Sequence, residues 1–281
     1  MRIFLKLFLP ALICVSAISP AAADPVSEFN ALVDQYFDSY FQTNPSEATQ
    51  VGFHQYDSKL EDYSAAGRKH EIAGLKDYLA KFGKLDRTGL PPDTAADLDW
   101  IISSIHGDLL ELETIQGWKK DPDTYTSGIT NGIFLLMKRN FGPPEDRLRS
   151  VIARERQFPK AFAAARQNLQ NPPRIYTEIA LEQLPDDIGF FRNDVPSAFS
   201  QVKDAKLLAE FKASNQAVIA EFQSCQKFLH DTVLPRSHGD FRLGAETYRT
   251  RNLDSYITRN VTVTICIFSL AIFTNYRIFL I

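Results

Sequence analysis

Histidines that stand beside carboxylates are the residues of this sequence that could carry hydrolytic chemistry. On a helix, the pattern H-E-x-x-H places two imidazoles one turn apart on one face, with a glutamate beside the water on a bound metal. His70-Glu71 is the only His-Glu pair, but Gly74 stands where the second histidine is required. The pair therefore fails as a zinc motif, and we expect His70 to be a solvated helix residue.

A second group of metal-ligand residue types surrounds a proline near the end of an expected helix. Its members are His230, Asp231, His238 and Asp240, on either side of Pro235. Their spacing matches no known ligand pattern. A histidine at the end of a helix is favourable for the helix dipole alone. We therefore expect no metal centre here.

Four further side chains are candidates for lining a cleft: His54, Asp57, Arg166 and Arg242. His54 and Asp57 fall in one tight turn, where they could face a cleft or, as we prefer, satisfy backbone groups of the turn. The two arginines could bind a peptide carboxylate across a groove, and surface ion pairing is the preferred alternative. No catalytic residue is assigned, because the sequence has no G-x-S-x-G elbow, phosphate-binding loop or G-x-G-x-x-G pattern.

The run from Asn44 to Asp57 must position the first of these pairs, and its sequence predicts a short helix with both ends marked. The side chain of Asn44 is suited to cap the helix N-terminus, Pro45 fits the first helical position, and the Glu47 carboxylate can reach back to the cap. Gly52 supplies the left-handed residue that ends the helix. We expect this helix and turn to fix the first long helix to the core.

Helical periodicity runs through the chain, and strand alternation is nearly absent before Asn252. Apolar side chains recur at i, i+3, i+4 and i+7, which is typical of amphipathic helices. Long helices are expected over about 25–41, 64–83, 93–112, 143–168, 175–184 and 203–233, with an irregular stretch over 117–132 and a kink at Pro159. The predicted fold class is all-α, a multi-helix bundle-like domain.

Several pieces of the sequence, taken in order, carry a family resemblance. They are Asn44-Pro45-Ser46-Glu47-Ala48-Thr49 with Gly52 to Asp57, Trp118 with Asp121-Pro122 and Tyr125, Arg166-Gln167-Asn168-Leu169 with Asn171-Pro172-Pro173, Glu178-Ile179-Ala180, and Gly239-Asp240-Phe241-Arg242-Leu243-Gly244 with Tyr248. Over about residues 28–248 the chain resembles the start of the bacterial family called domain of unknown function 885.

This resemblance implies a function for a longer protein. Members of the family are considerably longer and resemble helical zinc metallopeptidases, with an H-E-x-x-P-G-H-H type motif in their C-terminal half. The resemblance implies zinc, a peptide substrate and a metal-activated water in the full-length protein. This sequence has no such motif. We therefore expect no metal ligands, no cofactor and no hydrolysis in this chain, which resembles the truncated N-terminal half of a carboxypeptidase- or dipeptidase-type protein.

The first 23 residues predict an export signal. A positively charged start and an apolar run to Ile18 lead to an Ala-x-Ala cleavage site that ends at Ala23, leaving Asp24 as the mature N-terminus. Removal of the signal changes the formal net charge from −3 to −5, because two cations leave and no acid does. We expect the mature protein to be periplasmic or extracellular.

The charge pattern and the cysteines bear on two further possibilities, a nucleic-acid partner and a disulfide. Lysines and arginines are interleaved with acids and form no stripe, which argues against a nucleic-acid surface. Cys225 lies on an expected helix and Cys266 in the C-terminal tail. A disulfide between them could form in an oxidising compartment.

Residues 252–281 differ from the rest, since they hold no Lys or Glu, and residues 260–276 carry no charge. One interpretation is a membrane-spanning helix within about 260–281 that holds the protein at the inner membrane. The other, which we prefer, is a translated frameshift or insertion junction, because the family pattern stops there.

The expected divisions are a signal at 1–23, a helical domain at 24–251 and an aberrant apolar tail at 252–281. The alternative function is a non-enzymatic helical module of the cell envelope.

Overall fold

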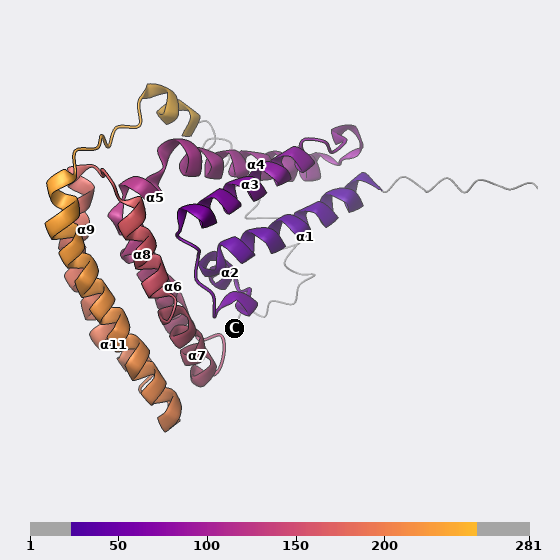
Figure 1. The fold of residues 1–281 in the computed structure, drawn as a ribbon. Coiled ribbons are helices and arrows are strands. Elements are labelled where there is room, and N and C mark those ends of the chain that lie inside the picture. Colours follow the sequence, from indigo (N-terminus) through magenta and orange to yellow (C-terminus); the bar gives the residue numbers. More distant parts are fainter. Residues whose placement is uncertain (1–23, 252–281) are drawn as a thin grey trace, which may run out of the picture.

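The computed structural model describes residues 24–251, and these residues form helices and connecting turns with no strand among them. The predicted all-α class is confirmed. The signal, the tail and Cys266 lie outside the described residues. The helices fall into two lobes, with the short α2 (Pro45–Val51) between them (Figure 1). The first lobe consists of α1 (Pro25–Thr43), α3 (Ala65–Phe82) and α4 (Pro92–Leu109), and the second is built on α6 (Ser127–Lys138), α7 (Pro144–Glu155), α8 (Phe158–Asn168), α9 (Arg174–Gly189) and α11 (Ala205–Phe228).

The helices of the first lobe begin where the sequence predicts. The Asp24 carboxylate accepts a hydrogen bond from the backbone N–H of Ser27 at 3.2 Å, and Pro25 occupies the first turn of α1. The Ser64 hydroxyl accepts from the N–H of Gly67 at 3.1 Å at the start of α3. The buried core of this lobe contains Phe29, Tyr36, Leu75, Phe82, Leu98, Ile101, Ile105 and Leu109.

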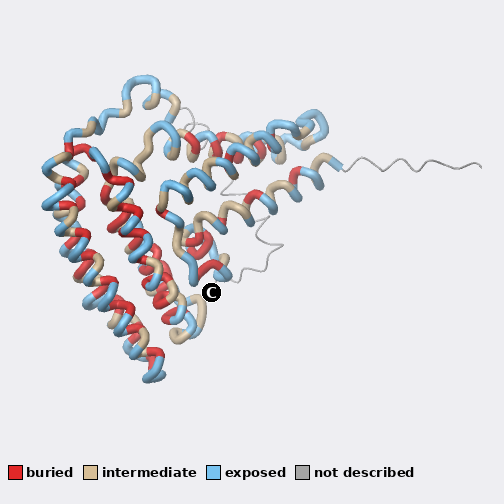
Figure 2. The backbone as a smooth tube through the Cα atoms, in the orientation of Figure 1, coloured by how far each residue is buried: buried red, intermediate tan, exposed pale blue. Residues whose placement is uncertain are grey.

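A larger core fills the second lobe. Figure 2 shows buried residues along the sides of α8 and α11 that face each other. Phe158, Phe162, Phe191 and Phe222 form an aromatic cluster, with centroid separations such as 5.0 Å between Phe162 and Phe222. Such edge-on ring contacts stabilise a core beyond the burial of area alone.

Pro159 separates α7 from α8, as the predicted kink requires. Its ring lacks the N–H that a continuous helix would need and clashes with the preceding turn.

By contrast, the prediction of an irregular stretch over 117–132 is wrong, because α6 begins within it. Ile129, Ile133 and Leu136 are fully buried on one face of α6. Packing of this stripe outweighs the turn-forming residues around it.

The helix predicted over 175–184 is longer than its periodicity indicates. The helix of α9 does not end at Leu184 but continues through the π-helical residues Phe190–Asp194 into α10 (Val195–Ala198). By contrast, α11 continues through Leu229–Val233 and so ends where the periodicity predicts. Residues 237–251 then cross from the second lobe towards α4 and α5 (Gly117–Lys120) (Figure 1).

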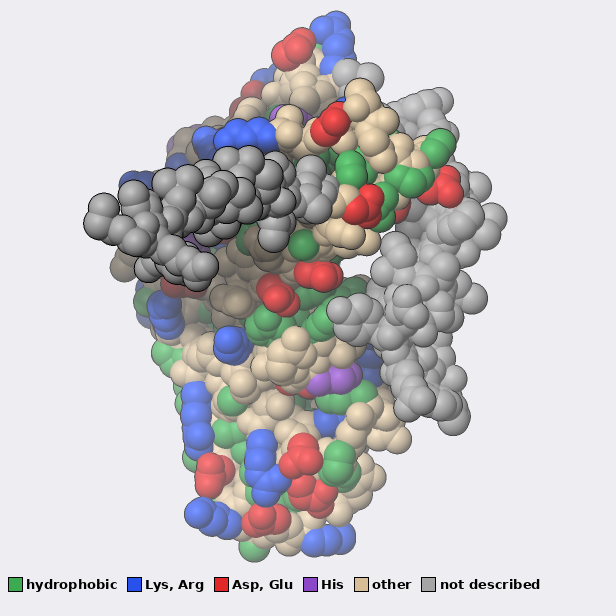
Figure 3. Space-filling view, turned by 90° about the vertical axis from the view of Figure 1, so that its right-hand side faces the viewer, with side chains coloured by type: hydrophobic (Ala, Val, Ile, Leu, Met, Phe, Trp, Pro, Cys, Tyr) green, Lys and Arg blue, Asp and Glu red, His purple; other side chains and the backbone are tan. Residues whose placement is uncertain are grey.

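The surface of the described residues mixes both signs of charge. On the face shown in Figure 3, basic and acidic side chains are interspersed in small groups rather than separated. Within residues 24–251, no helix has both the length and the apolar character needed to cross a bilayer.

Candidate functional site

The short helix α2 and the turn after it join the two lobes. Gly52 ends α2 with a φ of +96°, as predicted. The predicted capping by Asn44 is wrong, since its side-chain amide donates to the carbonyl of Tyr40 at 3.2 Å. The free N–H of Ser46 instead donates to Oε1 of Glu61 at 2.8 Å. A carboxylate from beyond the turn therefore replaces the local cap.

Arg154 of α7 is fully buried and binds this junction from the second lobe. Its guanidinium donates to the backbone oxygens of Lys59 at 2.8 Å, Gly132 and Pro45 at 3.3 Å. It also donates to Oγ1 of Thr49 at 2.7 Å. One side chain thus fixes three elements relative to one another, namely α2, α6 and the segment that precedes α3.

Thr49 connects this guanidinium to the predicted pair of His54 and Asp57. The Thr49 hydroxyl donates to Oδ1 of Asp57 at 2.7 Å, and Oδ2 of Asp57 lies 3.1 Å from Nδ1 of His54. Asp57 is buried, whereas the His54 side chain is 38% exposed and its ring stacks on that of Phe141 at 3.8 Å. When Nδ1 carries the proton, Asp57 fixes the ring and Nε2 keeps a lone pair for a proton or a metal.

The two candidate arginines lie elsewhere and have partners of their own. Arg166 of α8 donates to Oγ of Ser224 at 2.9 Å and lies 3.6 Å from the Glu221 carboxylate, both on α11. Nε of Arg242 donates to both carboxylate oxygens of Asp240, at 2.9 and 3.1 Å. Within residues 24–251, no hydrogen bond or ion pair joins either arginine to the His54–Asp57 pair. Both arginines therefore make ion pairs, which is the alternative that we prefer from the sequence, and binding of a peptide carboxylate stays an untested hypothesis.

Three carboxylates from α2, α3 and α4 gather in the first lobe, which sequence reasoning missed. Glu47 accepts a hydrogen bond from the Tyr40 hydroxyl at 2.6 Å, so the prediction that it returns to the helix cap is wrong. Burial, together with the negative charges of Glu47 and Glu71, raises the pKa of Asp108 to about 7. These acids come from separate helices, and no spacing along the sequence predicts their meeting.

Glu155, next to Arg154 in the chain, is a second buried acid that sequence reasoning missed. Burial raises its pKa to about 7, although the Ser214 hydroxyl and the Asn215 amide donate hydrogen bonds to its carboxylate. The spacing of apolar residues in the sequence predicts this burial. Glu155 continues at i+7 the apolar stripe that Leu148 begins and Ile152 follows at i+4.

The described residues offer no ligand set for the zinc that the family resemblance implies. Within residues 24–251, no three His, Cys, Asp or Glu side chains are placed to hold one metal ion. Around Pro235, Nδ1 of His230 lies 2.8 Å from the Asp231 carboxylate, which Lys227 also contacts at 2.6 Å. His70 is exposed on α3.

Several of the sequence pieces that carry the family resemblance bind one another. The Asn168 amide donates to the Tyr125 hydroxyl at 2.8 Å and to the carbonyl of Tyr63 at 2.9 Å. The N–H of Gly239 donates to the carbonyl of Pro172 at 3.0 Å. At these positions, the residues of the pattern hold loops and helix ends in place.

Comparisons with known proteins agree with this fold. A family model described as "Bacterial protein of unknown function (DUF885)" matches residues 45–264, which reach past the expected boundary at residue 252. Among solved structures, the chain is similar to a candidate lipoprotein of unknown function from Shewanella oneidensis, with a TM-score of 0.70 and 29% identity. The match covers 81% of this chain and 41% of that chain, so this chain spans less than half the length of that relative. No curated protein matches the chain.

Proposed function

This chain belongs to the DUF885 family of bacterial proteins of unknown function, and from that premise we propose that it is the N-terminal portion of an exported zinc metallopeptidase-like protein of carboxypeptidase or dipeptidase type. In this proposal the chain supplies the helical scaffold and one wall of a peptide cleft. The hydrolytic metal belongs to a portion that this chain lacks. The observation that carries the proposal is the length, because 81% of this chain matches only 41% of its solved relative.

His54 is the side chain through which this wall would meet the substrate or the metal-bound water. It is partly exposed, while Asp57 holds its Nδ1 from the buried side. Thr49 and Arg154 in turn hold Asp57 in position. This chain would therefore fix the orientation of an imidazole that becomes useful only when the metal-bearing portion is present.

Export of the protein is supported by two observations. The sequence begins with a predicted signal that ends at Ala23. The solved relative is described as a candidate lipoprotein, which is an exported class of protein. The mature chain should therefore be found outside the cytoplasm.

A hydrolysis assay tests the proposal. The mature chain, starting at Asp24, is purified and incubated with dipeptides and short peptides, with and without added zinc. We expect no release of amino acids in either case. Hydrolysis that a chelator abolishes and zinc restores would overturn the proposal, because the chain would then contain its own metal centre.

A second candidate function is a non-enzymatic helical module of the cell envelope, held to the membrane by its C-terminal run. The uncharged sequence over residues 260–276 favours this candidate. A carbonate wash of the membrane fraction, with protease treatment of a C-terminally tagged protein, distinguishes the two. Retention in the membrane with a protected tag would support the anchored module, and release by carbonate would argue against it.

A further inference from the structure

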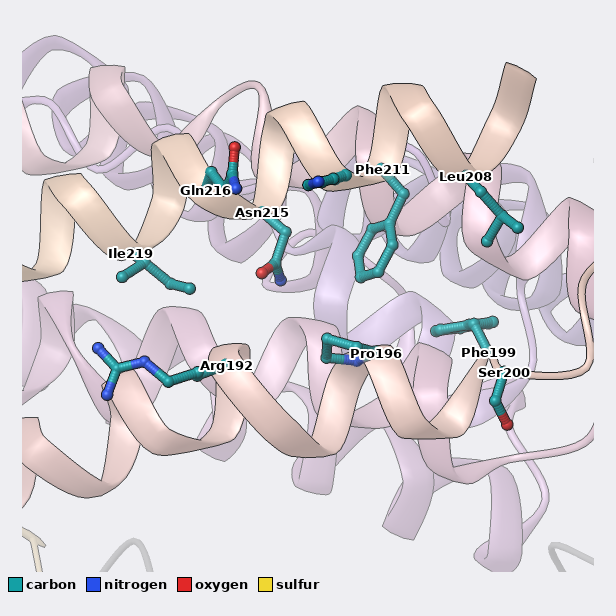
Figure 4. A pocket seen from close by; sticks show the side chains of 10 residues that line it. Arg192, Pro196, Phe199, Ser200, Leu208, Phe211, Asn215, Gln216 and Ile219 are labelled. Carbon is teal, nitrogen blue, oxygen red and sulfur yellow. The ribbon is translucent and has the colours of Figure 1, made fainter. Parts of the chain in front are cut away.

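A hollow of about 450 Å³ lies between α11 and the segment that runs from Phe190–Asp194 through α10. Figure 4 shows side chains of both segments facing each other across it. Its walls are largely apolar. The rings of Phe199 and Phe211 have centroids 6.4 Å apart, and Ile219 lines the hollow further along α11.

The charged side chains that line the hollow are all positive. Arg192 lines it from the segment of Phe190–Asp194 and Lys212 lines it from α11, and no Asp or Glu is among the residues that line it. Within residues 24–251, the side chains of Arg192 and Lys212 make no hydrogen bond or ion pair. Two cations without partners beside an apolar wall favour an anionic ligand with an apolar body.

The buried side-chain amide of Asn215 provides a polar group of fixed orientation in the wall of the hollow. Asn215 lines the hollow but is only 5% exposed. Its side-chain amide donates to Oε1 of Glu155 at 3.2 Å, which fixes the orientation of the side chain. An amide carries two N–H donors and one oxygen, so groups remain to bind a ligand.

We propose that this hollow binds an organic carboxylate whose body is apolar. The apolar body lies against Phe199 and Phe211, and the carboxylate pairs with Arg192 and Lys212. The size suits a small molecule, since binding pockets commonly measure about 300–1,000 Å³. Because neither zinc nor another portion of the protein takes part, this proposal stands independently of the proposed peptidase function.

Calorimetric titration of the mature chain with 4-phenylbutyrate tests the proposal. We expect saturable binding at one site, and binding at least about fivefold weaker for the neutral 4-phenylbutyramide, because the amide cannot pair with the cations. Octanoate should also bind, since the walls select for apolar character rather than for a ring.

Matched variants locate the binding. Arg192→Gln and Lys212→Gln are both exposed substitutions, and each should weaken 4-phenylbutyrate binding about three- to tenfold. Lys206→Gln removes a cation of the same helix that does not line the hollow, so it should leave binding unchanged. Equal affinity for the acid and its amide, unchanged binding in the double variant of Arg192 and Lys212, or no saturable binding would each overturn the proposal.

Discussion

Replacing Glu155 by glutamine should remove a pH-dependent loss of stability. Glu155 is 2% exposed in the core of the second lobe, and burial raises its pKa from 4.5 to about 7. The folded protein therefore holds this proton more tightly than the unfolded chain. The free energy of unfolding should fall as the pH rises from about 4.5 to about 7, and the loss should be complete above about 7.

The magnitude follows from the two pKa values. Each pKa unit corresponds to about 1.4 kcal/mol, so ionisation of Glu155 costs the folded state roughly 3 kcal/mol at pH 8. Glutamine keeps the shape and a hydrogen-bonding oxygen but cannot ionise. We expect Glu155→Gln to be more stable than the wild type by roughly 2–3 kcal/mol at pH 8, and within about 1 kcal/mol of it at pH 5.

Urea unfolding of both proteins at several pH values measures this difference. Glu210→Gln is the matched control, because the Glu210 side chain on α11 is 41% exposed and pairs with Arg156 at 2.9 Å. A surface pair of this kind contributes less than about 1 kcal/mol. If Glu155→Gln gains the same stability at pH 5 as at pH 8, or gains none at pH 8, the assignment of a buried carboxyl with a raised pKa is refuted.

Three further predictions follow from the packing. Arg154→Met should cost roughly 3–5 kcal/mol in urea unfolding because it leaves buried carbonyls unpaired, and the exposed Arg156→Gln should cost under about 1 kcal/mol; similar costs for the two would contradict the role of the buried guanidinium. Gly239→Ala should lower stability by roughly 1–3 kcal/mol in thermal unfolding, because the new Cβ would clash with the backbone oxygen of Asn171. With Cys266 replaced by serine, a thiol reagent should label Cys225 only on unfolding, because burial raises its pKa to about 12; rapid labelling of the folded protein would refute this.

Local signals predicted much of the fold. Asp24, Ser64 and Pro159 act through groups within a few residues of themselves, and the structure has helix boundaries at all three. The end of α2 at Gly52 is of the same kind, since only a residue that tolerates positive φ fits there. Signals of this type can be read from the sequence alone.

Interactions between distant segments account for the errors. Asn44 does not cap α2, because Glu61 supplies the carboxylate that binds the first turn. The start of α6 was not predicted, since burial of Ile129 and Ile133 outweighs the local turn-forming residues. In both cases tertiary packing overrides a local preference.

The candidate site was predicted in part for the same reason. His54 and Asp57 lie three residues apart in one turn, so their pairing is a local event. Arg154 binds Thr49 across 105 residues of sequence. Nothing in the spacing of those residues predicts that contact, and the same holds for the acids around Asp108.

The zinc content of the purified mature chain tests the central claim most directly. The chain is expressed with ample zinc, dialysed against metal-free buffer and analysed for metal per mole of protein. The account predicts zinc far below one equivalent, because the proposed function assigns the hydrolytic metal to a portion outside this chain and because residues 24–251 offer no set of three ligands for it. One equivalent of zinc that survives dialysis would contradict it.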